Sequence, residues 1–257
     1  MLNNLGDVKN YLSATLAPYI RETGPALNNR PVITPLNHNV LLVSPHPDDE
    51  CINGGLALRL QREAACTIYN FPFTFGSNIV RQVERKRELE SATQRLGFKN
   101  VFDRTLTETM EELSPTIILC PHEKDGHATH IAAAKKTREA LQAVKFDGLL
   151  VTCEFWQADE APNLLVEISE EDCATLMYAL LSHAGEIQRN PYHLRLPFWM
   201  MENTRRGSEL ILGTTAASSS ILLSTLYSIA RIERGQQRSI EKKLFLPVDQ
   251  NIGLLFQ

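Results

Sequence analysis

The sequence has little that would place it on a nucleic acid or in a membrane. Its 26 lysines and arginines are outnumbered by 30 aspartates and glutamates, which gives a formal net charge of −4 at pH 7. Nonspecific nucleic-acid binding needs clustered positive charge, so this balance argues against it. The apolar stretch ILLSTLYSIA at 221–230 is too short to cross a bilayer. The N-terminus has no basic segment followed by an apolar one, as a signal peptide would. We therefore expect a cytoplasmic protein with no nucleic-acid or membrane partner.

Cysteines are few, and none is close to another. The five are Cys51, Cys66, Cys120, Cys153 and Cys173. An odd, scattered set predicts reduced thiols rather than a disulfide framework, and the lack of a CxxC pair excludes a zinc-thiolate knuckle. The first apolar run is followed by PHPDDE and not by a G-x-G-x-x-G turn, which excludes a Rossmann dinucleotide site there.

What the sequence does have is an alternation of strand-like and helix-like segments. Continuous apolar runs at 40–44 and 116–120 are typical of strands buried on both faces. Helical spacing follows at 79–96 and at 127–144. With 257 residues and 43% hydrophobic content, the chain is long enough for one α/β domain. We predict a single domain over 1–257, a Rossmann-like, mostly parallel β-sheet with helices on both faces.

The two ends of the chain are harder to interpret. Residues 1–35 are expected to be an N-terminal extension with a helix at about 6–20. Residues 190–257 begin with a turn-rich stretch, then show a strand pattern at 209–213 and an apolar helix pattern at 217–233. We expect 190–257 to wall the substrate site or to form a subunit interface. The remaining expected elements are strands at 66–71, 99–102, 149–155 and 164–169 and a helix at 170–188.

Metal-ligating side chains gather after two of the predicted strands. PHPDDE (45–50) follows VLLVS, and PHEKDGHATH (121–130) follows TIILC. Sites in such folds form at the carboxyl ends of the strands. Four of the seven histidines lie in these two segments, namely His46, His122, His127 and His130.

The spacing within the two segments suits a catalytic metal site. His46 and Asp49 are three residues apart, and so are His127 and His130, which share a helix face. One of the latter pair could bind the metal while the other faces the substrate. Two nitrogens and one carboxylate oxygen leave a zinc ion one position for water. Asp48 can then serve as the base for that water.

Each segment alone has a plainer interpretation. HPDD could be a capping turn, and two histidines at helical spacing often lie on a solvated face. Together, each after a buried strand, they favour a metal site. Asp125 could either cap the following helix or line the pocket as a substrate-binding residue, and the sequence leaves both open.

The sequence also resembles a known family. VLLVSPHPDDECINGG (40–55) resembles the signature of the PIG-L/LmbE-like zinc-dependent N-acetyl-sugar deacetylases, and PHEKDGHATH resembles their HxxH element. RKRELESATQRLG (85–97) resembles a family helix that begins with an arginine and ends in Leu-Gly. The resemblance spans roughly residues 38–190.

The resemblance implies roles for five residues of the two segments. His46, Asp49 and His130 would be zinc ligands. Asp48 would be the general base, and His127 would stabilise the oxyanion or donate a proton. Zinc itself follows from the resemblance, because this ligand set would also suit another divalent metal such as Fe²⁺ or Co²⁺.

Further positions match less closely or depart from the family. Arg85 corresponds to a substrate-contacting arginine. His183, in SHAGEI, falls in an HxSQ-like element and is equally compatible with a pocket residue or a core histidine. Many relatives have an aspartate where this chain has Thr129, and FTFGSN at 73–78 differs from the usual Thr-Gly-Glu-like segment. These differences bear on the identity of the substrate.

The sequence thus predicts a zinc-dependent hydrolase that removes an N-acetyl group from a small amino-sugar derivative. One alternative is an amidase that uses the same site on a non-sugar amide such as a thiol conjugate. Another is a noncatalytic sugar- or nucleotide-binding module, although such a module would not need Asp48 as a base. A homo-oligomer is compatible with the sequence.

Overall fold

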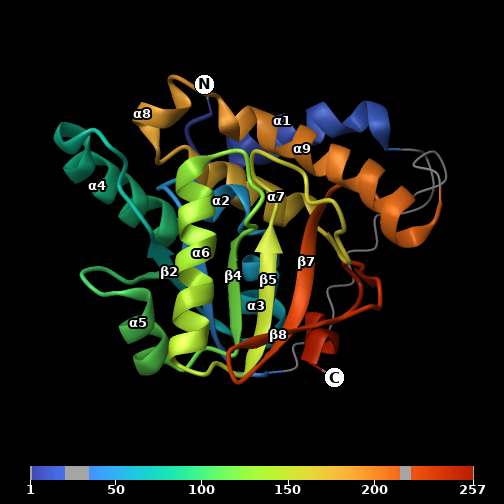
Figure 1. Cartoon of the computed structure of the whole chain (residues 1–257). Coiled ribbons are helices and arrows are strands. Elements are labelled where there is room, and N and C mark those ends of the chain that lie inside the picture. The colour runs from blue at the N-terminus through green and yellow to red at the C-terminus, as the bar shows by residue number, and fades with distance from the viewer. Residues whose placement is uncertain (1, 21–34, 215–220, 257) are drawn as a thin grey trace.

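The computed structural model describes residues 2–20, 35–214 and 221–256. In Figure 1 a central sheet has α5 (Leu106–Leu113) and α6 (Ala128–Ala143) on one face and α3 (Gly55–Ala64) and α7 (Glu170–Leu180) on the other. The predicted Rossmann-like α/β arrangement, with a mostly parallel sheet flanked by helices, is confirmed.

The order of the strands explains where the site forms. Along the sheet they run β3-β2-β1-β4-β5-β7-β6-β9, with β8 beside β7. The first five in this order are parallel, and β7 is antiparallel to each of the strands it pairs with, β5, β6 and β8. The strands are β1 (Asn39–Ser44), β2 (Thr67–Pro72), β3 (Lys99–Asn100), β4 (Ile117–Pro121), β5 (Gly148–Cys153), β6 (Leu164–Glu167), β7 (Ser224–Glu233), β8 (Gln236–Ser239) and β9 (Leu244–Leu246).

The other helices are short or amphipathic, and several have clear end signals. They are α1 (Leu5–Leu16), α2 (Asp49–Ile52), α4 (Ile79–Leu96), α8 (Ala184–Ile187) and α9 (Tyr192–Gly207). In α4 the Asn78 side chain accepts a hydrogen bond from the Val80 N–H, and Gly97 closes the helix at φ 75°. A left-handed residue at this position favours glycine. The predicted helix at 79–96 therefore coincides with α4.

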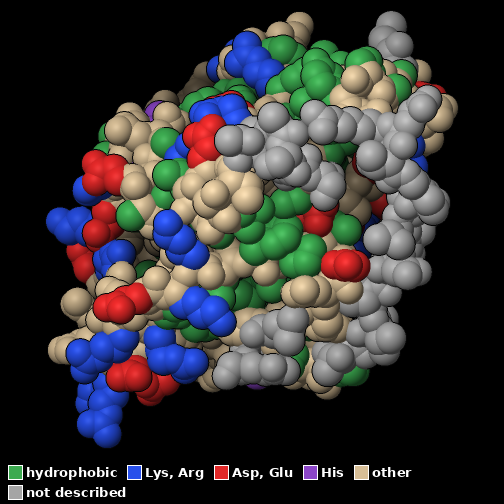
Figure 2. All heavy atoms as spheres, turned by 90° about the vertical axis from the view of Figure 1, so that its right-hand side faces the viewer, with side chains coloured by type: hydrophobic (Ala, Val, Ile, Leu, Met, Phe, Trp, Pro, Cys, Tyr) green, Lys and Arg blue, Asp and Glu red, His purple; other side chains and the backbone are tan. Residues whose placement is uncertain are grey.

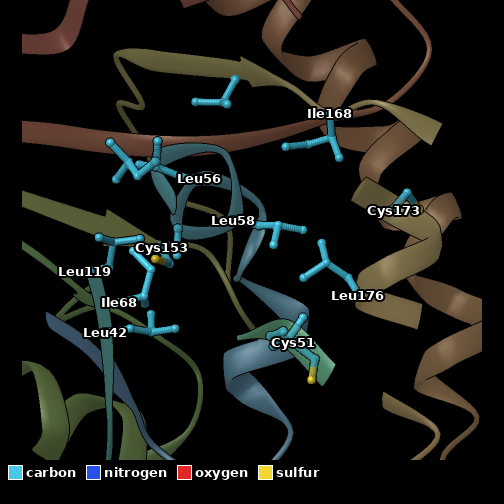
Figure 3. Close-up of a cluster of buried hydrophobic side chains, with 14 of the residues drawn as sticks. Leu42, Cys51, Leu56, Leu58, Ile68, Leu119, Cys153, Ile168, Cys173 and Leu176 are labelled. Atoms are coloured by element: carbon cyan, nitrogen blue, oxygen red, sulfur yellow. The ribbon is translucent and has the colours of Figure 1, made fainter. Parts of the chain in front are cut away.

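The core lies on both faces of the sheet. Val40 and Leu42 of β1 belong to a cluster with α3 and α7, whereas Leu41 and Val43 belong to a second cluster under α5 and α6. This two-sided burial is why the strand reads as a continuous apolar run. Figure 3 shows the first cluster, in which Leu42 lies with side chains of α3 and neighbouring strands.

Two predictions for the C-terminal region are wrong. The helix expected at 217–233 is strand β7 from Ser224 to Glu233, and 215–220 lie outside the described residues. The apolar run is buried because β7 pairs with β5 on one side and β6 on the other, so its tertiary position outweighs its local pattern. The strand expected at 209–213 is instead a π-helical turn, η2 (Ser208–Leu212), which continues α9.

The stretch predicted to be turn-rich is helix α9. Leu196, Met200 and Thr204, four residues apart, are all buried on one face of it. Pro197 lies inside the helix and hid this periodicity, because an internal proline usually argues against a helix. The helix expected at 170–188 is likewise divided into α7 and α8.

The remaining features of the fold are the N-terminal helix and the charged surface. Val8, Leu12 and Leu16 are the buried face of α1, which packs against α7. Among the described residues, no helix is long and apolar enough to span a membrane. Figure 2 shows basic and acidic side chains interspersed at the lower left of one face.

Candidate active site

Strand pairing brings the two histidine-containing segments together. β1 and β4 are adjacent and parallel, with Leu42 opposite Leu119. Their carboxyl ends therefore meet at one edge of the sheet, as expected for sites in open α/β folds. The first segment turns into α2 at Asp49, and the second turns into α6 with His127 as its N-cap.

Three of the predicted residues converge there. The Nδ1 atom of His46 lies 3.3 Å from Nε2 of His130 and 3.4 Å from Oδ2 of Asp49. Nε2 of His130 lies 3.6 Å from the same Asp49 oxygen. His130 and Asp49 are buried, and His46 is partly exposed.

This triangle of donor atoms has the dimensions of one face of a tetrahedral zinc site. Bonds of about 2.0–2.2 Å in tetrahedral geometry separate neighbouring ligand atoms by about 3.3–3.5 Å. The three observed separations, 3.3–3.6 Å, agree with that spacing. Two nitrogens and one carboxylate oxygen are also ligands that zinc accepts. The residues therefore fit a divalent cation with one position left open.

Asp125 lies behind His130 and not in the open mouth of the site. Its Oδ2 atom faces Nδ1 of His130 at 3.5 Å, and its oxygens accept hydrogen bonds from the backbone N–H groups of His127 and Trp156. Burial alone would raise the pKa of Asp125, but His130 and these two N–H groups lower it. A carboxylate behind a metal-binding histidine fixes the orientation of its ring.

Asp48 has an unusual backbone. Its φ of 113° is rare for a residue with a side chain. The Asp48 N–H donates to Oε2 of Glu50 at 2.9 Å, which helps to hold this conformation. Burial, then the carboxylates of Asp49 and Glu50, raises the pKa of Asp48 well above its ordinary value.

The partner of Glu50 comes from far along the chain. Nε2 of His183 lies 2.7 Å from Oε1 of Glu50, and both side chains are buried. Cys51 Sγ donates to the same oxygen at 3.1 Å. Although burial would raise the pKa of Glu50, His183 and the hydrogen bonds from Asp48 and Cys51 lower it. A 2.7 Å separation is a hydrogen bond and is too short for two ligands of one metal, so His183 supports the loop from inside.

His127 faces the same centre from the start of α6. Its ring centroid lies 5.0 Å from those of His46 and His130. The Thr129 N–H donates to Nδ1 of His127 at 3.2 Å. Partial burial, then His46 and His130, lowers the pKa of His127. Because Nδ1 accepts from the Thr129 N–H, the proton of a neutral His127 ring lies on Nε2.

Arg85 contacts the first segment rather than standing alone. It projects from α4, is half-buried, and donates to the Pro47 carbonyl at 3.0 Å. The family resemblance predicts Arg85 as a substrate contact, but the sequence does not indicate its hydrogen bond to the Pro47 carbonyl. No local signal in the sequence reveals the contact of Glu50 with His183, because the two are 133 positions apart.

The carboxyl edge of this α/β sheet therefore carries a His–Asp–His cluster that could hold a divalent cation with one coordination position open. The family model described as PIG-L, GlcNAc-PI de-N-acetylase, matches residues 41–141. This match confirms the family resemblance over the segment that holds both histidine-containing loops. No curated protein matches the chain.

Three solved structures with a similar fold are distant from this chain in sequence. A conserved protein from Thermus thermophilus, TT1542, has a TM-score of 0.56 at 19% identity, covering 74% of this chain and 93% of that one. GalB, a 4-carboxy-2-hydroxymuconate hydratase from Pseudomonas putida KT2440, has a TM-score of 0.57 at 17% identity, covering 74% and 95%. An N,N'-diacetylchitobiose deacetylase from Pyrococcus horikoshii has a TM-score of 0.54 at 16% identity, covering 91% and 95%. Because a hydratase is among them, the fold alone does not select the reaction.

Proposed function

We propose that this chain is a zinc-dependent deacetylase that removes an N-acetyl group from a small amino-sugar derivative. The observation that carries the proposal is the convergence of His46, Asp49 and His130, whose donor atoms lie 3.3–3.6 Å apart. These three side chains would hold the cation. When bound there, the cation would polarise the amide carbonyl and lower the pKa of a water molecule towards about 7.

Asp48 is proposed as the general base. It is buried and directly precedes the proposed ligand Asp49, which would place its carboxylate near the cation-bound water. Asp48 accepts a proton from the attacking water as the C–O bond forms. It then returns this proton to the nitrogen of the leaving amine as the C–N bond breaks, so that acetate and a free amine are released.

His127 is proposed to stabilise the carbonyl oxygen as negative charge develops on it. Because Nδ1 already accepts from the Thr129 N–H, the proton on Nε2 is free to donate. A hydrogen-bond donor aimed at a developing oxyanion contributes about 10²–10³-fold to the rate. This role uses the neutral imidazole.

The remaining predicted residues are proposed to position this machinery. Asp125 orients the His130 ring, His183 orients Glu50 and through it Asp48, and Arg85 holds the Pro47 carbonyl at the mouth of the site. The half-buried guanidinium of Arg85 leaves donors for a substrate oxygen. The family description and the chitobiose deacetylase neighbour support an N-acetylated amino sugar as substrate.

The direct test measures the acetate that the zinc-loaded protein releases from a panel of substrates. The panel contains N-acetylglucosamine, N,N'-diacetylchitobiose and non-sugar amides such as an N-acylated thiol conjugate. We expect acetate from the amino sugars, and Asp48→Asn should reduce turnover by about 10²–10⁴-fold while retaining the metal. Release from the non-sugar amides alone would favour the amidase alternative. Sugar binding without any acetate would favour the noncatalytic module, and full activity of Asp48→Asn would reject the assigned base.

A further inference from the structure

His122, the remaining histidine of the two loops, takes no part in the triangle of donor atoms. It directly follows β4 and is only 6% exposed. Its Nε2 atom lies 2.8 Å from the backbone carbonyl oxygen of Gln157. A carbonyl oxygen only accepts hydrogen bonds, so the imidazole donates through Nε2. His122 therefore joins the loop after β4 to the loop after β5, which covers residues 154–163.

The loop after β5 forms a wall of the proposed metal centre. β4 and β5 are parallel, with Pro121 opposite Cys153, so the two loops leave the sheet at the same edge (Figure 1). The Phe155 ring packs edge-on against the fully buried ring of His130, with centroids 4.8 Å apart. The position of this loop therefore determines how the His130 ring is covered.

A backbone contact connects the same loop to the carboxylate behind His130. The Trp156 N–H donates to Oδ2 of Asp125 at 3.2 Å, and this oxygen also faces Nδ1 of His130 at 3.5 Å. One carboxylate oxygen is thus shared between the loop and the histidine. Because a carboxylate in this position fixes the orientation of the ring, a displacement of Trp156 would reach His130 through Asp125.

Two other side-chain contacts hold the loop after β5. The Lys124–Glu160 ion pair joins it to the loop after β4, but these side chains are 72% and 75% exposed. Exposed ion pairs contribute little, whereas a hydrogen bond from the buried His122 ring is shielded from competing water. Glu154, at the start of the loop, pairs with Arg206 of α9. Loss of the His122 contact should therefore loosen 155–158 without releasing the whole loop.

We infer that His122 is a positioning residue of the proposed metal centre. Its hydrogen bond to the Gln157 carbonyl holds the loop after β5, so that Phe155 and the Trp156 N–H keep the His130 ring in place for the cation. The inference rests on the proposed function, because His130 is the ligand that this loop supports. It assigns a role to a histidine that neither binds the cation nor contacts the substrate.

Two measurements that do not depend on turnover test this role. Amide hydrogen exchange of the metal-free protein, followed by NMR, reports on the loop, and competition with a chelator gives the Kd for zinc. In His122→Leu we expect exchange at 155–158 to rise and the Kd for zinc to rise, each by about 3- to 10-fold, the effect of one hydrogen bond. His122→Gln should restore both values, because its side-chain amide can donate from the position of Nε2.

Matched variants separate this contact from other effects on the same loops. Lys124→Met removes the exposed ion pair and should leave the exchange and the Kd unchanged. Gln157→Ala keeps the backbone carbonyl that accepts from His122, so it should also behave as the wild type. Exchange in β1 is the internal reference and should be the same in all variants.

Three results would overturn the inference. Unchanged exchange at 155–158 in His122→Leu would show that His122 does not hold the loop. A loosened loop with an unchanged Kd for zinc would show that the loop does not support the metal centre. Faster exchange in β1 as well would show a general role in the fold.

Acetate release separates this inference from the proposed function. If the variants respond as expected but the wild-type protein releases no acetate, the proposed function fails and the positioning role stands. If the wild-type protein releases acetate and His122→Leu is unaltered in both exchange and Kd, the positioning role fails and the proposed function stands.

Discussion

At the scale of single residues, the site depends on a strained backbone held by a buried carboxylate. Asp48 adopts φ 113°, and Glu50 accepts from its N–H while also contacting His183. Unfavourable backbone conformations persist only where their surroundings enforce them. Glu50 therefore connects a buried histidine of the core to the position of the proposed base.

We predict that Glu50→Gln weakens both the fold and the reaction. The amide has one acceptor oxygen where the carboxylate has two, so it cannot serve both Asp48 and His183. The free energy of unfolding should fall by about 2–4 kcal/mol, and turnover should fall while the bound metal is retained. Denaturant unfolding and metal analysis measure the two effects. Glu90→Gln, on the exposed side of α4, is the control. Equal stability and turnover in the two variants would contradict this role.

The sequence was sufficient to predict which residues lie close together through local spacing, such as His46 and Asp49. Their order after buried strands follows from rules of α/β folds. The positions of Asp125 behind His130 and of His183 on Glu50 could not be predicted, because both depend on how distant segments pack.

At the scale of elements, the buried Arg59 of α3 connects the C-terminal segment to the sheet by hydrogen bonds. The Arg59 guanidinium donates to the carbonyls of Glu167, Leu246, Pro247 and Gln250 at 2.9–3.0 Å. It also pairs with Glu63 on its own helix. This one side chain thus connects β6, β9 and the segment that follows.

We predict that Arg59→Met costs about 3–5 kcal/mol of stability, because it removes the ion pair with the partly buried Glu63 and leaves several carbonyls without their donor. Amide hydrogen exchange should rise most in 244–256, where the fastened segment lies. Arg87→Met, at an exposed position on α4, should change neither quantity. Unchanged exchange in 244–256 of Arg59→Met would show that other contacts hold this segment.

The elements that could not be predicted from the sequence are those whose conformation depends on the elements packed against them. α4 and α6 show regular spacing and end signals, and both were predicted. β7 reads as an apolar helix but is a strand between β5 and β6, and α9 contains Pro197. Local pattern cannot reveal either outcome.

At the scale of the whole molecule, the proposed metal site joins two segments that lie on separate loops of the sheet. A cation bound to both should stabilise the folded chain over the unfolded one. At a free zinc concentration about 1,000 times the Kd, the stabilisation is about 4 kcal/mol. For a chain of this size that corresponds to a rise of roughly 8–16 °C in the thermal midpoint.

We therefore predict that chelation lowers the thermal midpoint and that added zinc restores it. Differential scanning calorimetry measures this shift, and His130→Ala should largely abolish the response to zinc. A midpoint that chelation leaves unchanged would argue against a cation that bridges the two loops.

The most direct measurement is a crystal structure of the zinc-loaded protein with anomalous diffraction at the zinc edge. The account predicts one peak per chain, about 2.0–2.2 Å from Nδ1 of His46, Oδ2 of Asp49 and Nε2 of His130. A strong peak held by other residues, or none at these three atoms in zinc-saturated crystals, would contradict it.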